Sequence, residues 1–138
     1  MRFVDASVFV HAFIKPRREL KEHEIRIKEA AKKIVKRINE GEGVAISTVH
    51  LSEIANLLEH YMPIDDALSV ETFLLTARNV KVHDVEKIDC VSALEVAKAT
   101  KVGLSDGIAY TIMKDNELNE VYSFDRDFDR LNVRRITE

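Results

Sequence analysis

Four acidic residues in this sequence stand at predicted element boundaries or within apolar stretches: Asp5, Glu53, Asp106 and Asp125. Asp5 is the clearest case, because it interrupts an otherwise apolar run from Phe3 to Val10. Burying a carboxylate is unfavourable unless the group is paired, hydrogen-bonded or bound to a metal ion. Each of these acids is therefore a candidate ligand for a cation.

Several carboxylates in one place would suit hard divalent cations such as Mg²⁺ and Mn²⁺, which prefer carboxylate and water oxygens as ligands. One or two such ions lower the pKa of a bound water and orient it for attack on phosphorus. The hydroxyls of Ser7 and Ser123 could hold a metal-bound water or a phosphate oxygen, and Arg126 and Arg130 could meet a phosphate. The five histidines show no zinc-ligand spacing with Cys90.

Strand and helix patterns alternate along the chain, which predicts an α/β fold with a mostly parallel sheet between two helical layers. Short apolar runs predict strands at residues 3–4, 43–47, 80–82, 121–124 and 133–136. Helical periodicity predicts helices at 7–13, 17–39, 48–61, 66–76, 86–101 and 105–116. With 138 residues and no linker or repeat, the whole of residues 1–138 is expected to form one domain.

This topology predicts that the four acids converge. The functional site of an open α/β sheet lies beyond the carboxyl ends of its strands. Asp5 and Asp125 each follow a predicted strand, and Glu53 and Asp106 lie in the first turns of helices that begin at the same edge.

Each acid also has an ordinary structural interpretation. Asp5 or Ser7 could cap a helix, and Asp106 could complement a helix dipole. Glu53 lies off the apolar stripe of its helix, which favours a solvent-exposed side chain, and Asp125 begins a polar, turn-rich segment. Both interpretations stay open for each acid.

Composition limits the class of protein. The formal net charge of −3 argues against tight non-specific binding to duplex nucleic acid. No apolar run is long enough to cross a membrane, and the N-terminus lacks the pattern of a signal peptide. A single cysteine, Cys90, favours a reducing compartment, so we expect a cytoplasmic protein. Glu22/Arg26, Glu24/Lys28 and Glu29/Lys33 are predicted pairs on a solvated helix face.

Four segments together resemble the PIN-domain family, and within it the VapC-like ribonuclease toxins of prokaryotic toxin–antitoxin pairs. The segments are Phe3–Ser7, Leu51–Ile54, Leu104–Ala109 and Ser123–Phe128, and the resemblance covers essentially the whole chain. It implies that Asp5, Glu53, Asp106 and Asp125 are the catalytic, metal-binding acids, that Ser7 is a supporting hydroxyl, and that Asp127 is a further candidate ligand.

The resemblance also implies a Mg²⁺- or Mn²⁺-dependent endoribonuclease that cleaves RNA, forms a homodimer and is inhibited by a cognate antitoxin. The long charged helix predicted from Arg17 to Asn39 departs from the smallest toxins of the family, and PIN domains also occur in RNA maturation. A PIN nuclease that is not a toxin therefore remains open as an alternative. A non-catalytic protein-binding domain, with acids that only cap helices or bind a structural ion, is the other.

Overall fold

The computed structural model describes residues 1–138 and contains one five-stranded, all-parallel sheet in the order β3-β2-β1-β4-β5. The strands are β1 (Arg2–Val4), β2 (Val44–Ser47), β3 (Val80–His83), β4 (Glu120–Tyr122) and β5 (Arg134–Ile136). The helices are α1 (Ala6–Phe13), α2 (Glu22–Asn39), α3 (Thr48–Tyr61), α4 (Ile64–Thr76), α5 (Lys87–Thr100) and α6 (Leu104–Asp115), with a 3-10 helix, η1 (Arg126–Arg130), before β5. The prediction of a three-layer α/β fold with a parallel sheet is confirmed.

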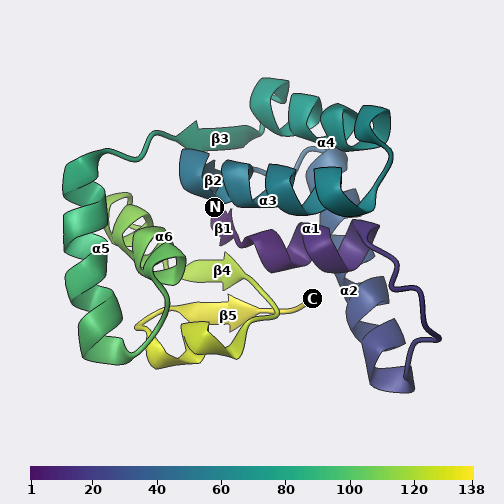
Figure 1. Cartoon of the computed structure of the whole chain (residues 1–138). Helices are drawn as coiled ribbons and strands as arrows, with labels where there is room; N and C mark the ends of the chain where they lie inside the picture. The colour runs from purple at the N-terminus through teal and green to yellow at the C-terminus, as the bar shows by residue number, and fades with distance from the viewer.

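Two apolar cores lie on opposite faces of the sheet. Helices α1 to α4 pack on one face, where Val4 and Ile46 belong to the same buried cluster as residues from all four helices. Helices α5 and α6 and η1 pack on the other face, where Phe3 and Ala45 point the opposite way. Figure 1 shows α5 and α6 together on one side of the strands and α1 to α4 on the other. Alternating residues of a strand face opposite sides of a sheet, so β1 and β2 are buried on both.

The close packing of α5 on α6 requires a glycine. A Cβ atom built on Gly107 would lie 2.5 Å from the carbonyl oxygen of Ala93 in α5. Only a glycine therefore allows the first turn of α6, which includes Asp106, to lie this close to α5.

Helix α2 is shorter than predicted because its start is set by side-chain contacts that periodicity does not reveal. It begins at Glu22, not near Arg17. The side chain of Glu24 accepts from the Lys21 amide at 3.0 Å, and its two oxygens also bind the guanidinium of Arg18 at 2.8 and 2.6 Å. Residues 17–21 thus lead into a capped helix.

The predicted ion pair between Glu24 and Lys28 is wrong, because the carboxylate of Glu24 binds Arg18 instead. Lys28 is buried, and its ammonium donates to the carbonyls of His11 and Ile14 at 3.0 Å each, at the C-terminal end of α1. A positive charge there complements the helix dipole and ties α2 to α1. Of the other predicted pairs, Glu22/Arg26 forms, while Glu29 contacts Lys32.

The remaining boundaries differ by a few residues. Pro63 and Gly103 hold the N-cap positions of α4 and α6, so these helices begin at Ile64 and Leu104, two residues and one residue before their predicted starts. Strand β4 ends at Tyr122, which leaves Ser123 and Phe124 in the loop that leads to Asp125. None of the helices combines the length and apolar character that crossing a bilayer requires.

Candidate metal centre

Three carboxylates meet at the carboxyl edge of the sheet. Asp106 lies in the first turn of α6, Asp125 is the N-cap of η1, and Asp127 lies in η1 itself. One oxygen from each lies within 4.8 Å of one from each of the others. The fold therefore brings two segments distant in the chain to the same point.

Asp5 is fixed next to this group by hydrogen bonds. It is the N-cap of α1, where its Oδ2 accepts from the amide of Ser7 at 3.3 Å and from the hydroxyl of Ser123 at 2.9 Å. Its own amide donates to the carbonyl of Tyr122 at 2.9 Å, which ties the end of β1 to β4. The expectation that Asp5 caps a helix is confirmed, and the same contacts hold the carboxylate at the sheet edge.

Two serines connect Asp5 to the loop that carries Asp125. The hydroxyl of Ser123 accepts from the amide of Asp125 at 3.0 Å while it donates to Asp5. The hydroxyl of Ser7 accepts from the amide of Phe124 at 3.0 Å and lies 3.3 Å from that of Ser123. Asp125 in turn accepts from the amide of Asp127 through Oδ1 at 2.9 Å. The loop between β4 and η1 is therefore fixed largely through these two serines.

Glu53 faces the same region from α3. Its side chain is half-buried, and Oε1 is buried without a hydrogen-bond partner. Burial raises the pKa of this carboxyl, the charge of Asp5 raises it further, and the side chain of Ser105 opposes the shift. The expectation of an ordinary solvent-exposed Glu53 is wrong, because α3 turns this position toward α6.

The electrostatics of Asp106 show how close the acids lie. Burial, followed by the charges of Asp125, Asp5, Asp127 and Glu53 in decreasing order, raises the pKa of the Asp106 carboxyl from near 3.8 to about 7. Like charges in a poorly solvated place favour the protonated form. The charges of the other four acids thus all reach Asp106.

The donor set fits a hard divalent cation. The three closest groups are all carboxylates, and Glu53 adds a buried oxygen with no partner in the protein. Oxygen-only sets of this kind suit Mg²⁺ or Mn²⁺, and a cation would offset the repulsion that raises the pKa of Asp106. Asp5 and Glu53 lie outside the group of three closest oxygens.

The two arginines near the site differ. Arg130 donates through Nη1 to the carbonyl of Lys101 at 2.8 Å, at the end of α5, so it has a structural partner. Arg126 is exposed between Asp125 and Asp127.

The sequence pattern assigned no role to His50, which is fully buried one helical turn before Glu53. Its position after Ser47, the N-cap of α3, was the available signal.

Comparison with known proteins identifies the family. Residues 2–133 match the model of the PIN domain. The chain belongs to the PIN-domain family. Among solved structures, it is similar over the full length of both chains to VapC20 of Mycobacterium tuberculosis, described as a sarcin-ricin loop cleaving toxin, with 18% identity and a TM-score of 0.76.

Two further structures share the fold. VapBC2 of Rickettsia felis, bound to a DNA fragment from its promoter, is 13% identical with a TM-score of 0.65, covering 98% of this chain and 96% of the other. FitAcB of Neisseria gonorrhoeae is 15% identical with a TM-score of 0.61, covering 99% and 96%. No curated protein matches by sequence.

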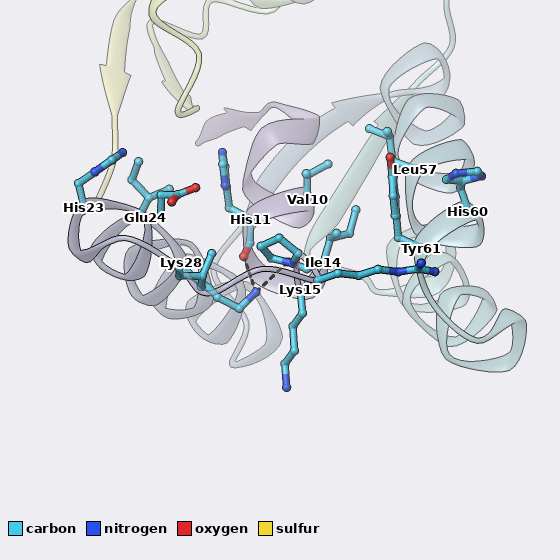
Figure 2. A pocket seen from close by; sticks show the side chains of 14 residues that line it. Val10, His11, Ile14, Lys15, His23, Glu24, Lys28, Leu57, His60 and Tyr61 are labelled. Atoms are coloured by element: carbon cyan, nitrogen blue, oxygen red, sulfur yellow. Dashed lines mark hydrogen bonds between the residues drawn. The ribbon is translucent and has the colours of Figure 1, made fainter.

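A cavity of this PIN domain lies away from the five acids. It has a volume of about 920 Å³ and is lined by the C-terminal part of α1, the segment that leads into α2, and the end of α3. Figure 2 shows Val10 and His11 of α1 facing it from one side and Leu57 and Tyr61 of α3 from another. None of the five acids lines this cavity.

Proposed function

We propose that this PIN domain is a divalent-metal-dependent endoribonuclease that hydrolyses RNA phosphodiester bonds, with Mg²⁺ or Mn²⁺ as cofactor. The observation that carries the proposal is the group formed by Asp106, Asp125 and Asp127, with oxygens within 4.8 Å of one another at the sheet edge. Such a cluster of acids at the functional edge of an α/β sheet has a clear chemical use in binding cations.

Each acid has a role in this proposal. Asp106, Asp125 and Asp127 hold the cation directly, and Asp5 and Glu53 complete the negative site from β1 and α3. When bound, the metal supplies a water of lowered pKa and neutralises charge on the scissile phosphate. Ser7 and Ser123 keep Asp5 and the Asp125 loop in register through the hydrogen bonds described above. Ser7 is therefore a supporting residue.

We further propose that the chain is the toxin of a VapBC-type pair, acting as a homodimer and inhibited by a cognate antitoxin. The similarity to VapC20 over the whole of both chains supports this assignment, as do the similar chains within toxin–antitoxin structures. A toxin should arrest growth when its expression is induced, and a small DNA-binding protein encoded beside it should relieve the arrest. Growth unaffected by an active nuclease would favour the RNA-processing alternative.

The catalytic proposal is tested with a matched pair of variants in the same segment. Asp125→Asn keeps the oxygen that accepts from the Asp127 amide but removes the charge. Asp129→Asn removes a charge of η1 that is paired with Arg135 at 3.0 Å and lies outside the cluster. Cleavage of single-stranded and hairpin RNA is measured with Mn²⁺ and with a chelator, and Mn²⁺ affinity is measured by calorimetry.

We expect metal-dependent cleavage by the wild type and by Asp129→Asn, with at least a 100-fold loss in Asp125→Asn. Mn²⁺ affinity should fall at least 10-fold in Asp125→Asn alone. Equal metal affinity and equal cleavage in the two variants would exclude the acid cluster as the site. Binding of Mn²⁺ without cleavage of any RNA would favour a structural ion in a protein-binding domain.

A further inference from the structure

The cavity beside α1 carries positive charge that has no partner within the chain. Two residues of its lining, Lys15 and Arg17, are exposed in the segment between α1 and α2. Neither takes part in any ion pair of the chain. The one acidic residue of the lining is Glu24, and its carboxylate already binds the guanidinium of Arg18 at 2.8 and 2.6 Å. Although the net charge of the chain is −3, this cavity therefore attracts anions.

Aromatic side chains line the same cavity. Tyr61, at the end of α3, is 61% exposed, and its ring meets that of His60 edge to face with centroids 4.6 Å apart. Figure 2 shows Tyr61 across the cavity from His11 of α1. Exposed flat rings beside cations form the kind of surface on which unpaired nucleic acid bases stack.

His11 connects the cavity to the metal centre. Its ring lines the cavity and meets the ring of Phe124 edge to face, with centroids 5.5 Å apart. Phe124 directly precedes Asp125, and its amide donates to the hydroxyl of Ser7 at 3.0 Å. Ser7 and His11 lie one helical turn apart in α1, which has eight residues and is therefore about 12 Å long. The metal centre and the cavity thus lie beside the two ends of one short helix.

We propose that this cavity binds the single-stranded RNA substrate beside the scissile bond, with Lys15 and Arg17 on its phosphates and Tyr61 stacked on a base. Unpaired cations, exposed rings and an apolar lining together suit a strand whose phosphates and base faces are both accessible. This inference rests on the proposed function, because it names where the substrate of that nuclease lies.

An acidic segment of a partner protein would also satisfy the two cations. The contact between His11 and Phe124 favours RNA instead, because it places the cavity next to the loop of Asp125, where the substrate must reach the metal. The two occupants are separated by the experiment below.

Two variants with matched controls remove the two kinds of contact. The double variant Lys15→Ala/Arg17→Ala removes both unpaired cations. Its control, Lys87→Ala/Lys98→Ala, removes two exposed lysines of α5 that form no ion pair and lie outside the cavity. Tyr61→Ala removes the exposed ring, and its control, Tyr61→Phe, keeps it. All five side chains are exposed, so each variant should fold.

Binding is measured by fluorescence anisotropy in a chelator, with a labelled single-stranded RNA of about 12 nucleotides. We expect the dissociation constant to rise by about 10-fold or more in Lys15→Ala/Arg17→Ala and in Tyr61→Ala, and to stay within about 3-fold in both controls. Each phosphate contact releases counterions. The slope of log affinity against log salt should therefore become less steep by about 1.4 in Lys15→Ala/Arg17→Ala, and not in its control.

With Mn²⁺, cleavage by Lys15→Ala/Arg17→Ala and by Tyr61→Ala should show a higher KM and a kcat within about 3-fold of the wild type, because the cavity binds substrate away from the reacting bond. Unchanged RNA affinity and salt slope in Lys15→Ala/Arg17→Ala would overturn the proposal. So would weaker binding of a poly-glutamate peptide with RNA affinity unchanged, which would assign the cavity to an acidic protein segment. RNA bound through the cavity but never cleaved with Mn²⁺ would refute the proposed function alone.

Discussion

Replacing Asp106 with asparagine should stabilise the metal-free protein above neutral pH. Burial, followed by four neighbouring carboxylates, raises the pKa of Asp106 to about 7. A raised pKa means that the folded protein binds this proton more tightly than the unfolded chain does. The contribution of this proton to the free energy of unfolding is fully present below pH 4 and is lost as pH rises through 7. Above that range, the ionised Asp106 opposes folding, and Asp106→Asn removes that penalty.

The size of the effect follows from the shift. A change in pKa from 3.8 to about 7 corresponds to an upper limit of about 4 kcal/mol. Water and counterions reach the sheet edge and screen these charges, so we expect about 1–2 kcal/mol at pH 8.5. For a domain of this size, that raises the melting temperature by about 3–8 °C.

The assay is a thermal melt at pH 5 and pH 8.5, in low salt with a chelator. Asp115→Asn serves as the control, because it removes an exposed acid from the other end of the same helix. At pH 5 the folded protein keeps the Asp106 proton but the unfolded chain has lost it, so only part of the penalty is present and the variant should gain less than at pH 8.5. At pH 8.5 the variant alone should melt higher. Excess Mn²⁺ should then stabilise the wild type more than the variant.

A lower melting temperature for Asp106→Asn at both pH values would refute this reasoning. It would mean that the carboxylate contributes mainly as a negative charge at the N-terminus of α6, which is the ordinary structural interpretation of this residue. Equal gains from Mn²⁺ in the two proteins would show in addition that Asp106 is not a ligand.

Three further substitutions test the supporting structure. Gly107→Ala places a Cβ 2.5 Å from the Ala93 carbonyl, so α6 must move, and we expect a loss of about 2–4 kcal/mol in urea unfolding together with weaker Mn²⁺ binding. Lys28→Met leaves the carbonyls at the end of α1 unpaired and should cost about 1–3 kcal/mol in urea unfolding while leaving Mn²⁺ affinity unchanged. Ser123→Ala removes the donor to Asp5 and should lower Mn²⁺ affinity measured by calorimetry, with unchanged affinity contradicting the role given to that hydroxyl.

The three-layer α/β fold and the position of the acids at the edge of the sheet were predictable from the sequence. Both depend on the local hydrophobic pattern and on the general topology of parallel α/β sheets. Apolar runs before Asp5 and Asp125 identified strands, and alternation with helices predicted a parallel sheet. In such a sheet, strand ends and helix starts share one edge. The structure has that edge, with Asp106 and Asp125 among the closest oxygens.

What the sequence could not reveal depends on contacts between distant segments. Lys28 has the spacing of a helix-surface partner for Glu24, yet it is buried against α1 because Arg18 already binds Glu24. The half-burial of Glu53 and the full burial of His50, whose ring contacts Phe3 of β1, depend on neighbouring elements far away in the sequence. Helical periodicity gives the direction in which a side chain leaves its own helix. It does not give how closely a neighbouring element approaches that side chain.

The two interpretations of the acids, helix cap and cation ligand, are compatible because a carboxylate has two oxygens. Asp5 binds the Ser7 amide and the Ser123 hydroxyl through Oδ2, and Asp125 binds the Asp127 amide through Oδ1. In each of the two carboxylates, one oxygen accepts these hydrogen bonds, and the other oxygen remains available to bind a cation. Capping therefore orients both side chains before any ion arrives, and less conformational freedom is lost when one binds. An acid that caps its own helix at the carboxyl edge of the sheet is for this reason a well-placed metal ligand.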